Sequence, residues 1–152
     1  MSLSTLNALL AEALAVAGLP SAALNASGMA EINVHGLAVA LEYMEADDRL
    51  VLYCSVGRLP AEVAPEIYEF LLEADLFGAK LGGGHIGLYG PARTLLFSFS
   101  LPLSGLNAAQ LGNALQRFAE RASALMNEIE ERLAGSAGTT DMTPFMGAML
   151  WV

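Results

Sequence analysis

Few side chains in this chain are of the types that carry out chemistry, and their spacing brings none of them together. The chain contains two histidines, His35 and His85, and one cysteine, Cys54. A metal site needs several such ligands at close spacing, and the sequence has no cluster of this kind. Cys54 stands among leucines in an expected strand, where an inert buried thiol is more usual than a nucleophile. The sequence therefore predicts no catalytic residue, no metal site and no cofactor.

The triplet Gly82-Gly83-Gly84 invites comparison with a phosphate-binding loop. Such a loop leads into a helix N-terminus and is followed by a Lys-Ser or Lys-Thr pair. Here the triplet leads into an expected strand, and no such pair follows. We interpret it as a connector whose glycines let two stretches of backbone approach closely.

The composition favours a binding protein over an enzyme. Hydrophobic residues make up 55% of the 152 residues and charged residues only 15%. Such a chain buries its apolar surface in its own core or under another protein, and its many alanines leave both alternatives open. The net charge of -9, with Lys80 as the only lysine, leaves no basic stripe, so we expect neither nucleic acid nor a membrane as partner. A lone cysteine and the absence of a basic segment in residues 1–17 favour cytoplasmic localisation.

Hydrophobic periodicity predicts a single α+β domain with the element order α-β-β-β-α-β-β-α, in which helices pack on a twisted antiparallel sheet. The expected helices cover 3–17, 63–77 and 107–134, and the expected strands cover 31–35, 37–44, 50–56, 85–89 and 94–101. The second face of the strand 50–56 is not cleanly polar, because Val51 and Tyr53 stand on it. We therefore expect these two residues to contact a partner.

The helix ends have recognisable signals. Ser2 or Ser4 can cap the first helix, and Gly18 can end it. Asn107 and Gln110 form a capping-box pattern at the start of the last helix, which we expect to end at Gly135. The chain then divides into a domain over 1–134 and, over 135–152, a flexible linker with an apolar C-terminal tail.

Four motifs stand in order over residues 3–133. They are a Leu9-Leu10 helix that ends in Gly18-Leu19-Pro20, then Leu71-Leu72-Glu73-Ala74-Asp75, then Gly82-Gly83-Gly84-His85-Ile86-Gly87-Leu88, and Leu101-Pro102-Leu103 before the last helix. Together with the element order, this set resembles the class I type III secretion chaperones, the Tir-chaperone family. Asp75 departs from the pattern, because the family usually has Asn there, and the family pattern does not explain the apolar tail.

The resemblance implies a homodimer that binds the extended N-terminal segment of a secreted effector. The family's partner groove uses the first helix and the sheet, which maps onto Leu6, Leu10 and Leu14. Its dimer contact uses the second helix and the strand after the glycines, which maps onto Ile67, Phe70, Leu71, Ile86 and Leu88. Backbone pairing and side-chain pockets supply affinity in such a binder without any catalytic residue.

The resemblance thus implies a bacterial cytoplasmic chaperone, not an enzyme, that keeps its effector soluble and competent for export. An α+β regulatory or scaffold protein of the same fold with no secretion role is the alternative. The tail is either a disordered end or a latch whose apolar residues occupy a groove in competition with the effector. Those residues are Phe145, Met146, Met149, Leu150 and Trp151.

Overall fold

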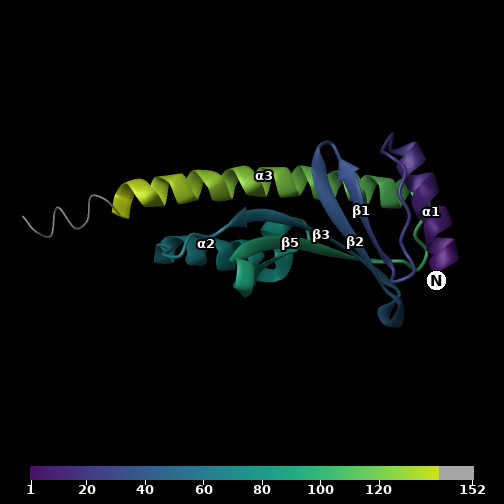
Figure 1. Cartoon of the computed structure of the whole chain (residues 1–152), viewed down its shortest axis with the longest axis horizontal. Helices are drawn as coiled ribbons and strands as arrows, with labels where there is room; N and C mark the ends of the chain where they lie inside the picture. Colours follow the sequence, from purple (N-terminus) through teal and green to yellow (C-terminus); the bar gives the residue numbers. More distant parts are fainter. Residues whose placement is uncertain (141–152) are drawn as a thin grey trace, which may run out of the picture.

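The computed structural model describes residues 1–140, with side-chain placement through residue 136. The elements follow the expected α+β order (Figure 1). They are α1 (Leu3–Val16), β1 (Met29–Val34), β2 (Leu37–Met44), β3 (Arg49–Arg58), α2 (Pro65–Asp75), β4 (His85–Tyr89), β5 (Thr94–Pro102) and α3 (Ala108–Thr140), with short 3-10 turns η1 (Glu45–Asp47), η2 (Leu76–Leu81) and η3 (Gly90–Ala92).

The five strands form one antiparallel sheet in the order β1-β2-β3-β5-β4. The pairing of β3 with β5 is the longest, and it places β1 and β4 at the two edges. His35 and Gly36 connect β1 to β2 with φ values of 52° and 90°, the left-handed conformation that a two-residue hairpin turn requires. The expected tight turn at Gly36 is confirmed.

One long helix organises the core. Figure 1 shows α3 running along one face of the sheet, with α1 at its N-terminal end and α2 beside its C-terminal half. Along the three middle strands, side chains that face α3 alternate with side chains that face outward. The buried, helix-facing set is continuous with the inner stripe of α3. Its fully covered members include Leu41, Leu50, Leu52, Leu95, Phe97, Leu111 and Leu115.

Local signals set the ends of two helices as expected. Ser2 caps α1 through its hydroxyl, which accepts from the Thr5 backbone N–H at 3.1 Å. At the other end Gly18 has a φ of +67°, and Leu19 donates its N–H to the Leu14 carbonyl at 2.9 Å, as in a Schellman motif. At the start of α3, Asn107 and Gln110 exchange side-chain-to-backbone hydrogen bonds of 2.9 and 3.0 Å, which confirms the capping box.

The end of α3 differs from the expectation. The helix continues through Gly135 to Thr140, so the prediction that Gly135 ends it is wrong. A C-terminal glycine stops a helix only when it adopts a positive φ, and Gly135 does not. An interior glycine costs about 1 kcal/mol relative to alanine, and no proline stands between Pro102 and Pro144 to break the helix. The apolar tail predicted at 145–151 lies outside the described residues.

Gly84 lets β4 approach the core side chain of Phe97. A Cβ on Gly84 would stand 2.4 Å from Cε2 of Phe97, and the Phe97 ring is itself stacked on Phe118 at 4.9 Å. The close approach expected of the glycine triplet is therefore present at this position.

We predict that Gly84→Ala lowers the free energy of unfolding by about 1–3 kcal/mol, because the added methyl overpacks the Phe97 ring. Urea titration followed by circular dichroism measures this. Gly87→Ala is the control, since nothing lies within 4 Å of its Cβ position, and it should change stability by less than about 0.5 kcal/mol. Equal effects of the two substitutions would contradict the packing argument.

Candidate partner-binding and dimerisation surfaces

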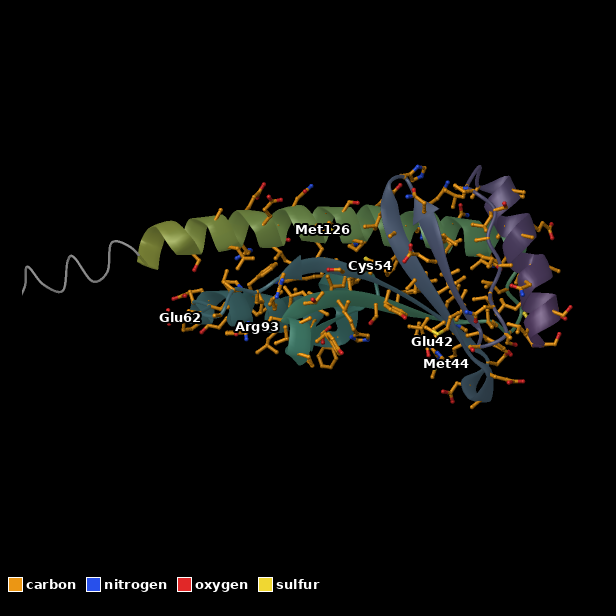
Figure 2. The ribbon with its side chains drawn as sticks, in the orientation of Figure 1. Glu42, Met44, Cys54, Glu62, Arg93 and Met126 are labelled. Atoms are coloured by element: carbon orange, nitrogen blue, oxygen red, sulfur yellow. The ribbon has the colours of Figure 1, made fainter. Side chains whose placement is uncertain are left out.

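The reactive side chains lie apart from one another. His35 stands in the β1–β2 turn, and His85 at the start of β4 places its Nδ1 3.3 Å from the Asp75 carboxylate. Cys54 lies between α3 and the sheet (Figure 2) and is 5% exposed. Within residues 1–140, no three His, Cys, Asp or Glu side chains gather where they could hold a metal ion.

Leu6, Leu10 and Leu14 belong to the core of the protomer rather than to a surface. None of the three is more than 1% exposed, because the inner stripe of α1 packs on α3. The segment after α1 folds back over the helix and is held by Asn7, whose side chain exchanges hydrogen bonds of 2.8 and 3.1 Å with the backbone of Leu24. The assignment of these leucines to a partner groove is therefore corrected.

Val51 and Tyr53 stand on the outer face of the sheet, as expected, and both are half-buried. Their cross-strand neighbours are Glu42 and Ser100 for Val51, and Ala40 and Ser98 for Tyr53. This mixed apolar and polar face is accessible in the protomer. Its contact with a partner stays a prediction.

An open groove runs between β5 and α3 on the inner side of the sheet, and we call it the β5–α3 groove. Its volume is about 720 Å³, within the roughly 300–1000 Å³ of clefts that hold ligands. Sequence reasoning missed it, although the alternation of β5 placed Phe97, Phe99 and Leu101 on one face. The lining comprises Leu81, Gly82, Phe97, Phe99, Leu101, Gln110, Asn113, Ala114, Arg117, Phe118, Glu120, Arg121 and Ala124.

The β5–α3 groove has an apolar floor and a mixed wall. Phe97 and Phe118 are buried and stacked at its base, whereas Phe99 and Leu101 are half-exposed and form the open part of the floor. On the wall, Arg121 donates to the Lys80 carbonyl at 3.2 Å. Such a surface can bury apolar side chains of a ligand, and it offers the charged groups of Arg117, Glu120 and Arg121 beside them.

A second exposed apolar surface covers α2, η2 and β4, and we call it the α2–β4 strip. Tyr68, Leu72 and Leu76 follow one another at four-residue spacing on the outer side of this segment. Leu72 is 73% exposed and Phe77 is 91% exposed, which is unusual for large apolar side chains in a protomer that is stable alone. Leu88 and Tyr89 of the edge strand β4 are also exposed.

The residues assigned to the dimer contact divide between this strip and the core. Ile67 and Leu71 are buried within the protomer, and their assignment to the dimer contact is corrected, because they form the inward stripe of α2. Phe70 is half-buried under Arg132, whose guanidinium lies 3.8 Å from the ring centroid. Ile86 is half-buried and Leu88 is 46% exposed. The sequence did contain a signal for this strip. Leu72, the second residue of the Leu71-Leu72 pair, falls outside the inward stripe of the helix, which indicates an exposed apolar side chain.

Asp75 holds the edge of β4 against α2. Its carboxylate accepts the Ile86 backbone N–H at 2.7 Å, which points away from β5. This role needs an acceptor oxygen, which the side chain of Asn also has. Asp75, which stands where the family usually has Asn, therefore keeps the contact that positions β4.

The fold and these two apolar surfaces define a class of protein that binds other polypeptides. The family model described as the Tir chaperone protein (CesT) family matches residues 8–126. This chain therefore belongs to the Tir chaperone protein family, whose members are type III secretion chaperones. No curated protein sequence matches the chain. None of the helices within the described part of the chain has the length and hydropathy needed to cross a bilayer.

Three solved structures share the fold. The ExsC-ExsE complex matches with a TM-score of 0.69 and 21% identity over 82% of this chain and 93% of that chain. The HopA1-SchA chaperone-effector complex matches with 0.63 and 19% over 86% and 98%. The Yersinia pestis type III secretion chaperone SycH, solved with a fragment of YscM2, matches with 0.61 and 22% over 78% and 98%.

Burial raises the pKa of the Cys54 thiol from 9.0 to about 11, so we predict that the folded protein resists alkylation. Iodoacetamide at pH 8 should modify the native protein far more slowly than the urea-unfolded chain, as measured by mass spectrometry. Burial also makes the free energy of unfolding depend on pH, because the folded state favours the protonated thiol. The contribution of Cys54 to that free energy is complete below about pH 9 and is lost as the pH rises through about 11. Equal alkylation rates in the two states would show that Cys54 is accessible.

Proposed function

We propose that the protein acts as a homodimer in the bacterial cytoplasm, where it holds the N-terminal segment of a secreted effector in an extended, export-competent state without catalysing a reaction. The β5–α3 groove is the observation that carries this proposal. It offers apolar side chains and rim arginines to a polypeptide, and its lining contains neither histidine nor cysteine. Family membership and the chaperone-effector complex among the structural relatives support the same interpretation.

The α2–β4 strip supports the homodimer. Exposure of the large apolar side chains of this strip to water is unfavourable, and a second copy that covers the strip removes that exposure. The backbone N–H of Ile86 points away from β5 and is already bound by Asp75. The backbone N–H of Leu88, two residues further along the same edge, also points away from β5. A twofold contact through this strip would pair like surfaces of two copies.

We predict that the chain runs at about twice its 15.9 kDa in light scattering and that Phe77→Asn shifts it toward the monomer. Phe77 has a φ of +55°, which Asn tolerates better than Phe, so the substitution removes the apolar ring without straining the backbone. We therefore expect the backbone around residue 77 to keep its conformation in the Phe77→Asn variant, so that any loss of dimer reflects the missing ring and not local unfolding.

Val16→Asn is the matched control, because Val16 is 66% exposed at the far end of α1 and outside the strip. It should leave the dimer intact. A wild-type monomer at micromolar concentration, or a Phe77→Asn variant that is as dimeric as the wild type, would overturn the proposed contact.

The effector segment would lie in the β5–α3 groove and against the outer face around Val51 and Tyr53. Binding of an extended chain gains from side chains that enter pockets and avoids the cost of unfolding a compact domain before export. Neither contribution requires nucleotide. We propose that binding and release by this protein alone are independent of ATP.

We predict that Ala114→Glu weakens binding of the effector's N-terminal segment at least tenfold while the dimer persists, because the carboxylate enters the apolar part of the groove. Co-purification from the native host identifies the effector, and isothermal titration calorimetry then measures the affinity. Ser123→Glu is the control, since Ser123 is exposed on the same helix but does not line the groove. Similar losses for both variants, or a requirement for ATP, would contradict the proposal.

A further inference from the structure

The two sides of the β5–α3 groove run beside each other in opposite directions (Figure 1). Residues 103–107 join β5 to α3, so the helix turns back along the strand. Phe118 of α3 stacks on Phe97 of β5, and Gln110 lines the same groove as Leu101. The eight-residue step along the helix rises about 12 Å and the four-residue step along the strand about 14 Å. Leu101 therefore lies near Gln110, at the opposite end of the floor from the stacked rings.

The open part of the floor fits an extended polypeptide. Phe99 and Leu101 are two residues apart on β5, which separates their side chains by about 6.8 Å. Alternate side chains of an extended ligand have the same spacing, so two of them can rest on this pair. The lining of α3 from Gln110 to Ala124 is about 21 Å long, the length of about six extended residues. The groove therefore accepts a short extended segment with apolar side chains at alternate positions.

Two arginines line the wall of the groove between its floor and its outer edge. Successive helix residues are rotated by about 100°, so Arg121 is about 60° and Arg117 about 100° around α3 from Phe118 at the base. Glu120 is about 160° from Phe118 on the same side, and it is the outermost charged residue of the lining. A carboxylate just above the floor therefore meets both guanidinium groups before it meets Glu120.

Both guanidinium groups are available to a ligand. Among the residues whose side chains the structure places, no carboxylate pairs with Arg117 or Arg121. Arg121 donates one N–H to the Lys80 carbonyl at 3.2 Å, and a guanidinium has further N–H groups to donate. The chain has a net charge of -9, but physiological salt screens exposed charges beyond about 8 Å. The charges nearest the groove therefore decide which ligand charge it attracts.

We propose that the β5–α3 groove selects an extended partner segment in which two apolar side chains at alternate positions stand next to an acidic residue. The apolar side chains lie on Leu101 and Phe99, and the acidic residue lies beside Arg117. The distances agree, because the third residue beyond the one on Leu101 is about 10 Å along an extended chain and Arg117 is about 10.5 Å along α3 from Gln110. Arg117 is then a specificity-determining residue, since a lysine at that position of the partner would be repelled. This inference rests on the proposed function for the identity of the partner, and it names the chemistry of the effector segment.

Two synthetic peptides that differ only in the sign of their charge test this selectivity. The acidic peptide is Ser-Glu-Leu-Ser-Leu-Glu-Ser and the basic peptide is Ser-Lys-Leu-Ser-Leu-Lys-Ser, and their symmetry serves either direction of the chain. Both carry the same fluorophore, and fluorescence anisotropy measures their affinity for the full-length protein. We expect the acidic peptide to bind the wild type about fivefold more tightly, a difference of the size that partly exposed charge pairs produce. The preference should decrease as the salt concentration rises.

Variants of the wall identify the residue responsible. Arg117→Glu should reverse the order of the two peptides, and Arg117→Gln, which removes the charge without reversing it, should abolish the preference. Arg58→Glu is the matched control, because it changes the net charge as much as Arg117→Glu and Arg58 is exposed on β3 outside the groove. It should keep the wild-type preference. A wild type that does not bind the acidic peptide, a wild type without preference, or equal effects of Arg117→Glu and Arg58→Glu would each overturn the inference.

The effector's N-terminal segment, identified by co-purification, separates this inference from the proposed function. If both hold, the acidic peptide competes with the effector segment for the wild type. If the peptides behave as expected but no effector segment binds, the proposed function fails and the selectivity of the groove stands. If the effector segment binds but Arg117→Glu leaves the order of the peptides unchanged, the proposed function stands and the selectivity is overturned.

Discussion

The packing of α3 on the middle of the sheet is the constraint on which the rest of the structure depends. Phe118 of α3 stacks on Phe97 of β5 with ring centroids 4.9 Å apart, and Gly84 leaves room for that ring on the other side. Such an aromatic pair adds about 0.5–1.5 kcal/mol beyond the area that it buries. It fixes β5, and with it β4, relative to the helix.

The same packing explains why two apolar surfaces remain open. A helix with its side chains is about 10–12 Å wide, whereas five strands about 4.8 Å apart span about 19 Å. α3 covers the middle of the sheet and α1 packs on its N-terminal end, so the exposed flank of β5 becomes the floor of the groove. The inward stripe of α2 is used within the protomer, and its outer residues are therefore left for another chain.

Charge is distributed to keep these surfaces accessible without loss of solubility. The chain carries a net charge of -9, and the acidic side chains of α2 surround the pocket beside Phe70. Arg132 of α3 contacts α2 there, because its guanidinium lies over the Phe70 ring, and Glu128 on the same helix pairs with it at 3.2 Å. The apolar floor of the groove is bordered by two arginines, Arg117 and Arg121, and one acidic residue, Glu120, so it is less acidic than the pocket beside Phe70.

The sequence by itself determined the element order, the turn at Gly36 and the caps at Ser2, Gly18, Asn107 and Gln110, because these depend on neighbours within a few residues. Its ordered motifs also indicated the family. Only the tertiary structure decided which apolar faces stay open, since periodicity shows that a face is buried but not what buries it. Leu10 and Leu71 lie in the core because another helix or the sheet covers them, whereas Leu72 and Phe99 remain accessible because no described element does. The end of α3 was decided by the backbone conformation of Gly135, which residue type alone leaves open.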